Sequence, residues 1–169
     1  MTPLSAVLLL VVVQRLSELA LAARNANALK SIGGVETGAG HYPLIVLLHA
    51  AWLVAIAAAV PLGTRPSWAL LTLWPALLAA RLWIIHSLGP FWTTRIITVP
   101  GLPLVRRGPY RWLRHPNYLI VALEIAVLPL AFGAWRVALV FSLLNAALLA
   151  WRIRIEDAAL APRRRLGQS

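Results

Sequence analysis

The sequence predicts an all-α integral membrane protein with about five transmembrane helices, the last two of which form a helical hairpin. Its mean hydropathy is +0.77, and 60% of its residues are hydrophobic while only 12% are charged. Soluble domains are far less apolar than this. The second observation is a series of apolar segments close to the roughly 20 residues that a span requires. The chain also has no cysteine, which excludes disulfides, thiolate metal ligands and cysteine nucleophiles.

Five segments are apolar enough to cross a bilayer, and we expect them to form one membrane-embedded domain over residues 1–169. The first starts without a basic segment and no small-residue cleavage site follows it, so we expect a retained span rather than a signal peptide. Pro75 should kink the third span, and the fourth is the shortest. The expected spans are residues 4–23, 42–60, 68–85, 118–132 and 136–155.

The formal net charge is +11, and the basic residues gather in the loops and the tail. If the spans alternate in direction, twelve Lys and Arg lie on one side of the membrane and only Arg65 and Arg136 on the other. The positive-inside rule then predicts an outer N-terminus and a cytoplasmic C-terminus, in a bacterial inner membrane. Lipid headgroups explain the charge, including Arg163–Arg165, more simply than nucleic acid does, and no obligatory protein partner is evident.

Four charged residues fall inside the expected spans, where an unpaired charge is costly. Arg15 and Glu18 are one helical turn apart and should pair or face a polar interior. Glu124 should pair with Arg15 or Arg81, unless its pKa is raised so that it exchanges protons. Arg81 could instead extend toward the cytoplasmic face. The sequence leaves open whether these residues are structural ion pairs or part of an acceptor site.

The connections contain two notable segments. Residues 25–42 are rich in glycine, asparagine and small residues, and we expect a flexible turn region and a candidate lid. Residues 86–117 form a loop of about 30 residues, a length that is usually functional, in which 93–99 should be extended. His49, within a span, is expected to be a hydrogen-bonded packing residue rather than a ligand. An interfacial aromatic belt is expected at Trp83, Phe91 and Trp92.

Residues 106–118 contain four arginines, two prolines, two tyrosines and a histidine directly before an apolar run. Pro116 suits the first turn of a helix, whose free N–H groups favour an anion. The last two spans are joined by only Gly133–Trp135 and should form an antiparallel hairpin. At about 1.5 Å per residue, His115 and Arg152 then lie at nearly the same depth. The hairpin should therefore gather five polar residues, Arg114, His115, Arg152, Glu156 and Asp157.

Two motifs in this region resemble those of a known family. The isoprenylcysteine carboxyl methyltransferase family of integral membrane enzymes has motifs similar to Gly108-Pro109-Tyr110-Arg111-x-x-Arg114-His115-Pro116-x-Tyr118, followed after a hairpin by Arg152-x-x-x-Glu156-Asp157-x-x-Leu160. The likeness covers roughly the last 65 residues. The earlier part of the chain looks like a bacterial branch often placed beside type III polyketide synthases and linked to O-methylation of phenolic lipids or alkylpyrones. The segments that carry this likeness are Gln14-Arg15-x-x-Glu18-Leu19, His41-Tyr42-Pro43 and Thr93-Thr94-Arg95.

The resemblance implies a methyltransferase that uses S-adenosyl-L-methionine and a lipophilic acceptor that enters from the bilayer. It implies a cytoplasmic cofactor region at about 86–117 and 152–160. The implied cofactor-binding residues are Tyr110, Arg114, His115, Pro116, Tyr118, Glu156 and Asp157. The implied catalytic residues are Glu156 and Arg152.

The chain departs from the family pattern in three places. Ile120 stands where a glycine is common, Asp157 stands where a second glutamate is usual, and the Phe-Gly-x-x-Tyr segment that usually follows the acids is missing. That segment belongs to the pocket wall in the family. The sequence therefore leaves the acceptor open among a prenylcysteine, an alkylresorcinol, an alkylpyrone or another lipid, and it leaves the oligomeric state open.

The acceptor decides which chemical groups are needed. A carboxylate acceptor needs no base, only a cation such as Arg152 or Arg111 to hold it. A phenol, with an ordinary pKa near 10, needs a base or a charge that favours the phenolate, and the candidates are Glu156, Glu124 and His86. No metal centre is expected, because the four histidines lie in four different segments.

Two other functions fit the same sequence features. An NADPH-dependent membrane reductase of the sterol-reductase type also has a His-Pro-x-Tyr hairpin, and its cofactor phosphate could meet the arginines; titration with the two cofactors separates it from a methyltransferase. A small transporter or assembly protein would use the charges inside the spans as a polar pathway. In that case those charges, and not the hairpin end, would matter for activity.

The charge distribution predicts the topology, which single-cysteine labelling tests because the chain has no cysteine of its own. A membrane-impermeant maleimide added to intact cells should label Thr64→Cys. It should label Arg106→Cys only after lysis. Labelling of Arg106→Cys in intact cells would contradict the predicted orientation.

Overall fold

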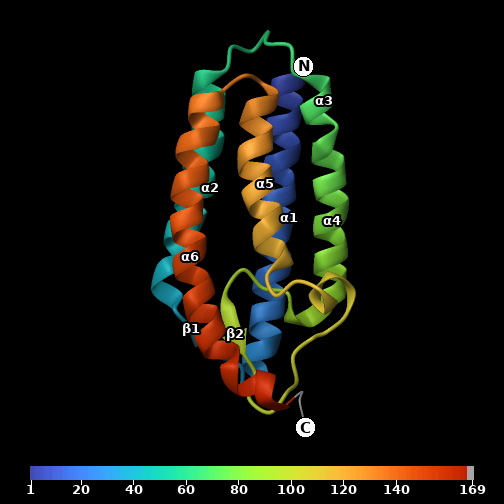
Figure 1. Ribbon diagram of the computed structural model, residues 1–169, viewed down its shortest axis with the longest axis vertical. Coiled ribbons are helices and arrows are strands. Elements are labelled where there is room, and N and C mark those ends of the chain that lie inside the picture. Colours follow the sequence, from blue (N-terminus) through green and yellow to red (C-terminus); the bar gives the residue numbers. More distant parts are fainter. Residues whose placement is uncertain (167–169) are drawn as a thin grey trace.

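The computed structural model describes residues 1–166, which form an upright bundle of long helices (Figure 1). The helices are α1 Pro3–Ser31, α2 Tyr42–Ala59, α3 Trp68–Leu71, α4 Leu73–Leu88, α5 Pro116–Ala131 and α6 Trp135–Leu166. Short elements lie between them: the 3₁₀ turns η1 Ala39–His41, η2 Gly89–Phe91 and η3 Gly108–Arg111, and the strands β1 Val35–Thr37 and β2 Ile96–Thr98. We call the end with the N-terminus the upper end, and the end with the strands the lower end.

The expected all-α membrane fold is confirmed. Four helical stretches are long and apolar enough to cross a bilayer, and α5 is a shorter apolar helix. The chain is therefore a multi-pass membrane protein. Helices α1 and α6 exceed their expected spans, with 29 and 32 residues, because a polar segment ends a membrane span without ending a helix. The four stretches are Pro3–Ser31, Ala39–Ala59, Trp68–Phe91 and Trp135–Arg164.

Proline and glycine set several helix boundaries. Pro116 opens α5, and Gly133, with φ +73°, turns the chain between α5 and α6. The third span is broken between Leu71 and Leu73. Pro75 has no N–H to donate to the carbonyl of Leu71, so the expected kink is present about one turn before the proline.

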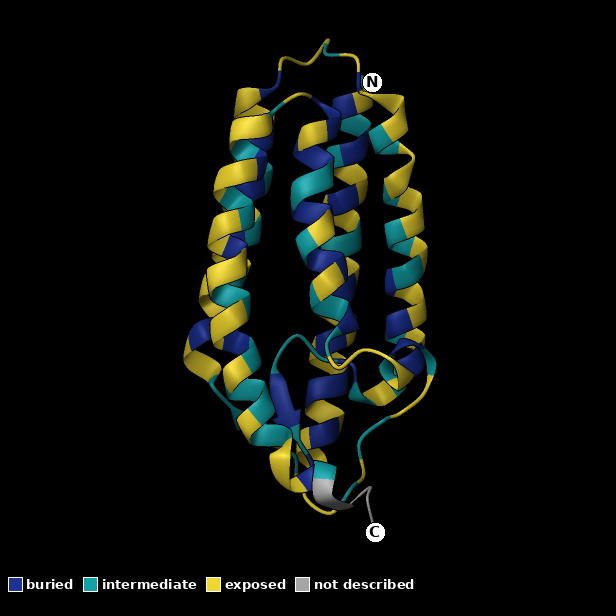
Figure 2. Cartoon of the chain, viewed as in Figure 1, coloured by how far each residue is buried: buried dark blue, intermediate teal, exposed yellow. Residues whose placement is uncertain are grey.

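Apolar side chains fill the upper half of the bundle. The exposed residues lie along the outer faces of the helices (Figure 2), and many of them are apolar. Leu4, Trp52 and Ile125 belong to this core, where Trp52 Nε1 donates a hydrogen bond to the carbonyl of Ile125 at 3.2 Å. On the outer faces, Leu47 and Leu143 are each 64% exposed. Exposed apolar area of this extent marks a surface that contacts lipid.

Below the core, the four-charge cluster of Arg15, Glu18, Arg81 and Glu124 joins α1, α4 and α5. The guanidinium of Arg15 lies 3.0 Å from Glu18 Oε2 and 2.5 Å from Glu124 Oε2. The guanidinium of Arg81 lies 2.8 Å from Glu18 Oε2 and 3.0 Å from Glu124 Oε2. The expected pairing is confirmed. Arg81 is only 4% exposed, so the alternative that it extends to the membrane edge is wrong.

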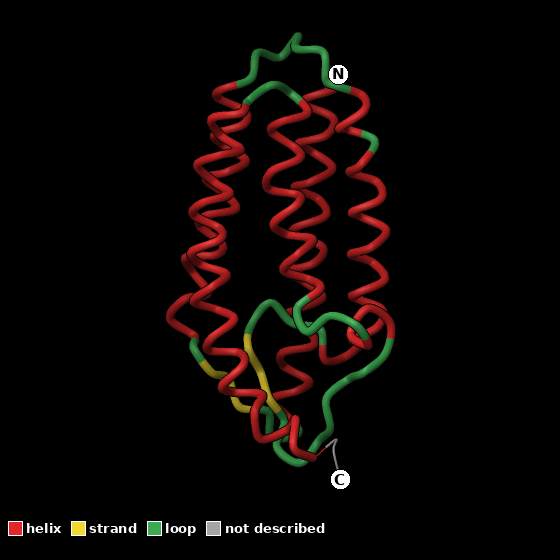
Figure 3. Tube along the Cα trace, viewed as in Figure 1, coloured by secondary structure: helices red, strands yellow, loops and turns green. Residues whose placement is uncertain are grey.

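The two strands correct the prediction for residues 25–42. The extended piece expected within 93–99 is confirmed as β2, which pairs antiparallel with β1, so that Glu36 lies opposite Ile97 (Figure 3). Residues 25–42 are therefore not a flexible turn throughout. Residues 35–37 of this segment form β1, whose backbone is fixed by pairing with β2 in a two-stranded ribbon at the lower end.

The expected aromatic belt is also corrected at one position. Trp83 is 50% exposed, as a belt residue would be, but Trp92 is 2% exposed. The carbonyl of Trp92 accepts a hydrogen bond from Asn25 Nδ2 at 2.8 Å. Trp92 therefore packs inside the lower end, where it holds the long loop against α1.

The four-charge cluster predicts a large effect of removing one charge. Arg81→Leu leaves two carboxylates with one arginine and should lower the free energy of unfolding by about 3–5 kcal/mol. The double variant Arg81→Leu/Glu18→Leu restores the charge balance and should be more stable than Arg81→Leu alone. Unfolding in mixed detergent micelles measures both, and equal stability of the single and double variants would contradict the role of pairing.

Candidate functional site

The residues that the hairpin was expected to gather do meet at the lower end. His115 Nε2 lies 3.1 Å from Asp157 Oδ1, and His115 Nδ1 lies 3.6 Å from Glu156 Oε2. The His115 ring stacks on the Tyr118 ring, with centroids 5.4 Å apart. The predicted juxtaposition of the His-Pro corner with the acidic turn of α6 is confirmed.

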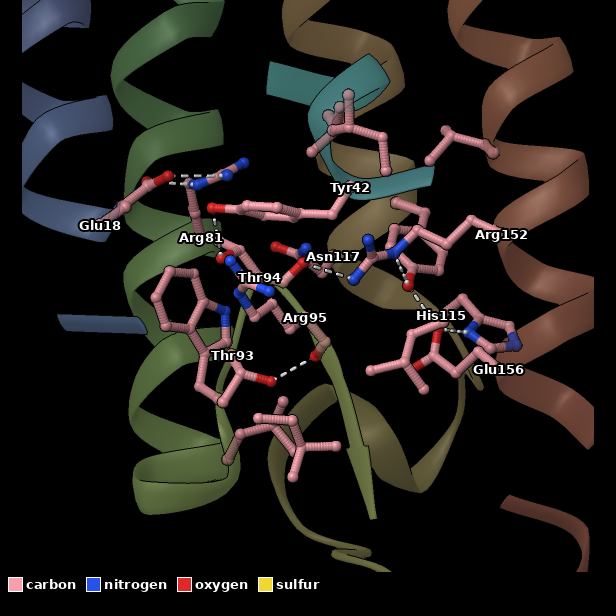
Figure 4. Close-up of a pocket in the computed structure, with 18 of the residues that line it drawn as sticks. Glu18, Tyr42, Arg81, Thr93, Thr94, Arg95, His115, Asn117, Arg152 and Glu156 are labelled. Atoms are coloured by element: carbon pink, nitrogen blue, oxygen red, sulfur yellow. Dashed lines mark hydrogen bonds and ion pairs between the residues drawn. The ribbon is translucent and has the colours of Figure 1, made fainter. Parts of the chain in front are cut away.

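Arg152 connects this corner to the long loop (Figure 4). The Tyr118 hydroxyl donates a hydrogen bond to Glu156 Oε2 and accepts one from Arg152 Nε at 2.6 Å. Arg152 Nη2 donates to the carbonyl oxygen of Thr94 at 2.8 Å. Arg152 is 6% exposed, so its charge is confined by these partners. The hydroxyl of Tyr118 is held between a cation and an anion, which fixes the side chains on both helices.

His41 is a further member of the site; the sequence singled it out only within the His41-Tyr42-Pro43 motif and gave it no role in the site. Its Nε2 lies 3.3 Å from Arg152 Nη1. A guanidinium can only donate, so Nε2 accepts and the neutral ring carries its proton on Nδ1. Gly38, with φ +67°, allows the close approach: a Cβ there would lie 2.8 Å from Ile155 Cγ2 and 2.9 Å from His41 Cε1. No spacing signal marks His41, because the ribbon alone brings it to α6.

Ion pairs on the ribbon keep this part of the site in place. Glu36 lies 2.5 Å from Lys30 Nζ and 2.6 Å from Arg95 Nη1. The guanidinium of Arg95 also lies over the Tyr42 ring, 4.4 Å from its centroid. The hydrogen bonds from Lys30 and Arg95 hold the pKa of Glu36 below its usual value.

A cavity of about 670 Å³ rises from this group toward the four-charge cluster. Its lower part is polar and its upper walls are mostly apolar, with Leu16, Leu53 and Leu148 among them. Figure 4 shows Glu18 and Arg81 on one side, with His115, Arg152 and Glu156 across from them. This volume is typical of small-molecule sites. Polar lining residues between the two sides include Tyr42, Thr93, Thr94, Arg95 and Asn117.

The residues expected to bind the cofactor fall into two groups. Tyr110, Arg114, His115, Tyr118 and Glu156 line the cavity, as does Arg152 of the expected catalytic pair. Burial and the charge of Glu156 raise the pKa of Tyr110 well above that of an ordinary phenol, so this hydroxyl stays a donor. The second group, Pro116 and Asp157, does not line the cavity. Pro116 is the first residue of α5, and Asp157 forms a hydrogen bond with His115.

Two other expectations from the sequence lie outside the cavity. The exposed residues Arg111 and His86 do not line it. Within residues 1–166, no group of three or more histidine, aspartate or glutamate side chains could hold a metal ion.

The basic tail is corrected in part. Arg163 is 6% exposed and donates to the carbonyls of Leu102 and Pro103 at 2.7 and 2.9 Å. Arg164 pairs with Asp157. These two arginines therefore hold the loop and the site rather than lipid headgroups, while the side chain of Arg165 lies outside the part of the chain that is described.

Comparison with known proteins agrees with this geometry. Residues 70–162 match the model of the isoprenylcysteine carboxyl methyltransferase family. The chain belongs to this family. The matched range contains the His-Pro corner, Arg152 and the acidic turn of α6. Helices α1 and α2, which also line the cavity, precede the matched range.

Two curated relatives extend the similarity over most of the chain. The chain is 41% identical over 155 residues to YpbQ, an uncharacterised protein of Bacillus subtilis strain 168, covering 89% of this chain and 92% of the relative. It is 28% identical over 153 residues to an uncharacterised protein of Haemophilus influenzae, covering 87% and 88%. No solved structure matches this methyltransferase-family protein.

The lowered pKa of Glu36 predicts how the ribbon responds to acid. A carboxylate whose pKa is lower in the folded protein stabilises it above the ordinary pKa of about 4.3, and loses that effect as the pH falls through the lowered value. At pH 7, Glu36→Gln should therefore have a lower thermal midpoint than the unchanged protein. The difference should close below about pH 4, and a difference independent of pH would contradict the role of the ion pairs.

Proposed function

We propose that this protein transfers a methyl group from S-adenosyl-L-methionine to an oxygen atom, a carboxylate or phenolic hydroxyl, of a lipophilic acceptor dissolved in the membrane. The observation that carries the proposal is one cavity that has charged residues at its lower end and apolar side chains such as Leu16, Leu53 and Leu148 among its upper walls. A polar donor and an apolar acceptor can meet in such a cavity. Membership of a membrane methyltransferase family supports the reaction class.

The lower part of the cavity fits this donor chemically. S-adenosyl-L-methionine has an ammonium, a carboxylate, ribose hydroxyls and an adenine, all of which need polar partners. Glu156 can accept from the ammonium or the hydroxyls, and Arg114 can pair with the carboxylate. The hydroxyl of Tyr110 is a donor, and Asn117 Oδ1 is buried without a partner in the described chain. These groups would hold the donor beside the stacked pair of His115 and Tyr118.

When bound, this donor supplies an electrophilic methyl group on a cationic sulfur. The protein needs few catalytic groups for such a transfer, because alignment and exclusion of water account for much of the barrier. Arg152 is buried and fixed by Tyr118 and Thr94, so it supplies positive charge near an acceptor oxygen without rearranging. Glu156 fixes Tyr118 and anchors the donor.

The acceptor would enter from the bilayer through the apolar part of the cavity. Leu16 and Leu53 line that part from α1 and α2, whose outer faces contact lipid. A single alkyl chain could remain among these side chains while its oxygen-bearing end reaches the polar part. With the predicted topology, the donor site opens to the cytoplasm, where S-adenosyl-L-methionine is made.

Three variants test the proposal. Glu156→Gln should weaken binding of labelled S-adenosyl-L-methionine by about tenfold or more, because a charge-assisted hydrogen bond contributes about 1.5–3 kcal/mol. Arg152→Gln should lower methyl transfer to membrane lipid extracts by about a hundredfold, in the range of about 2.7–4 kcal/mol for a lost electrostatic donor. Arg136→Gln, the same change at the upper end, should match the unchanged protein.

Binding is measured in detergent, with NADPH as the competing candidate. Binding of NADPH, and not of S-adenosyl-L-methionine, would contradict the proposal and favour a reductase. Donor binding that is unchanged in Glu156→Gln would remove the role of that carboxylate.

A further inference from the structure

An exposed pair of indoles lies near the lower end of the third membrane-spanning stretch. Trp83 belongs to α4, Trp112 directly follows η3, and their ring centroids are 6.3 Å apart. Trp83 is 50% exposed and Trp112 is 71% exposed. The guanidinium of Arg111 lies over the Trp112 ring, 5.8 Å from its centroid. We call these three side chains the tryptophan–arginine surface.

The segment that carries Arg111 and Trp112 is fixed to α4. Arg107 Nε donates a hydrogen bond to the carbonyl oxygen of Ser87 at 2.6 Å. Gly108, with φ +57°, packs so closely on Ser87 that a Cβ at this position would overlap the Ser87 hydroxyl. The tryptophan–arginine surface therefore has a defined position beside the last turns of α4.

This position is the level at which a membrane span meets the lipid headgroups. The apolar stretch Trp68–Phe91 ends four residues after Ser87, and the long loop follows it. Indole rings are enriched at this level of a bilayer. A guanidinium at the same level can form paired hydrogen bonds with a phosphate. The surface therefore combines the two side-chain types that suit a phospholipid headgroup.

The arginines of this segment have no acidic partner. The chain has five acidic residues: two belong to the four-charge cluster, one to the ribbon and two to the acidic turn of α6. Each of the five already has a polar partner there. Within residues 1–166, no ion pair includes any of the four arginines of the segment, which are Arg106, Arg107, Arg111 and Arg114.

The proposed donor site can use some of these arginines but not Arg111. Arg106 and Arg114 line the cavity, where a donor carboxylate can meet them. Arg111 is exposed and does not line the cavity. Its charge and the exposed indole that it covers therefore have no role in the proposed methyl transfer.

A groove borders the same segment and favours a lipid over a soluble anion. Its volume is about 420 Å³, and its lining combines Arg106 and Arg107 with apolar side chains such as Phe91 and Leu104. A soluble anion would use only the arginines. A phospholipid has a phosphate for the arginines and acyl chains for the apolar side chains, so it matches the whole lining.

We propose that the tryptophan–arginine surface is a docking site for an anionic phospholipid of the leaflet at the lower end, which is the cytoplasmic leaflet in the predicted topology. The excess of positive charge selects an anionic lipid over a zwitterionic one. A lipid bound here also steadies the adjoining wall of the cavity, because Arg106, Leu113 and Arg114 of the same segment line that wall. This second part rests on the proposed donor site.

The upper end of the bundle has a similar pair of side chains that serves as a matched control. The guanidinium of Arg136 lies over the Trp135 ring, 5.3 Å from its centroid, and Trp135 is 57% exposed. The sequence places only one other arginine, Arg65, near that end. A stacked arginine and indole are thus present at both ends, but the cluster of arginines is present only at the lower end.

Lipid titration of the detergent-solubilised protein tests the docking site. Phosphatidylglycerol should raise the thermal midpoint more than phosphatidylcholine with the same acyl chains. Arg111→Gln should weaken the apparent affinity for phosphatidylglycerol by about fivefold, the contribution of one arginine near an anionic lipid surface. Arg111→Lys keeps the charge and should retain most of the affinity. Arg136→Gln, the matched control, should behave like the unchanged protein.

Three results would overturn the docking site. They are an equal shift with phosphatidylcholine, an equal shift with inorganic phosphate at the same ionic strength, and an affinity for phosphatidylglycerol that Arg111→Gln leaves unchanged. Because Arg111 is exposed and unpaired, Arg111→Gln should have the same midpoint as the unchanged protein when no lipid is added. That measurement separates lost lipid binding from lost stability.

Donor binding in nanodiscs tests the effect on the cavity wall. Labelled S-adenosyl-L-methionine should bind about fivefold more tightly in nanodiscs that contain phosphatidylglycerol than in nanodiscs of phosphatidylcholine alone, a typical coupling between two sites. Arg111→Gln should reduce this difference, and Arg136→Gln should not. Equal donor affinity in both nanodiscs would overturn the effect on the cavity wall. Absence of donor binding in both would contradict the proposed function itself, while the lipid titration would still decide whether the docking site exists.

Discussion

A charge inside an apolar bundle must be matched by an opposite charge or by hydrogen bonds, and this requirement arranges the lower half of the protein. Arg15 and Arg81 are matched by Glu18 and Glu124, which fastens α1, α4 and α5 to one another. Arg152 is matched differently, by Tyr118, Thr94 and His41. The cavity lies between these two sets of contacts, so the groups that stabilise the bundle also line the space where chemistry can occur.

The fold and part of the site could be predicted because their signals are local. Apolar length gave the spans, and the short turn at Gly133 implied that His115 and Arg152 share a depth, which the structure confirms. The ribbon could not be predicted, because each strand has only three residues and the pairing joins loops about sixty residues apart. The contact of His41 with Arg152 was missed, and Arg163 was misread as a residue that meets lipid headgroups. The reason is the same, since contacts with residues far away in the sequence give both side chains their positions.

The two halves of the bundle differ in what fills their interior. The upper half is filled with buried apolar side chains such as Trp52 and Ile56. The lower half contains the cavity, which lies between the four-charge cluster and the contacts of Arg152.

The contact of His41 with Arg152 joins residues 111 positions apart, and the contact of Arg15 with Glu124 joins residues 109 positions apart. During synthesis, the first two helices therefore enter the membrane long before their partners exist. Until α5 has been inserted, Arg15 has only Glu18 of its own helix as an ion-pair partner. Until α6 has been inserted, His41 must be accommodated by water, lipid headgroups or the insertion machinery. We therefore expect the nascent chain to be most vulnerable to degradation in that interval. Insertion of its final helix is the step that commits the chain to the native state.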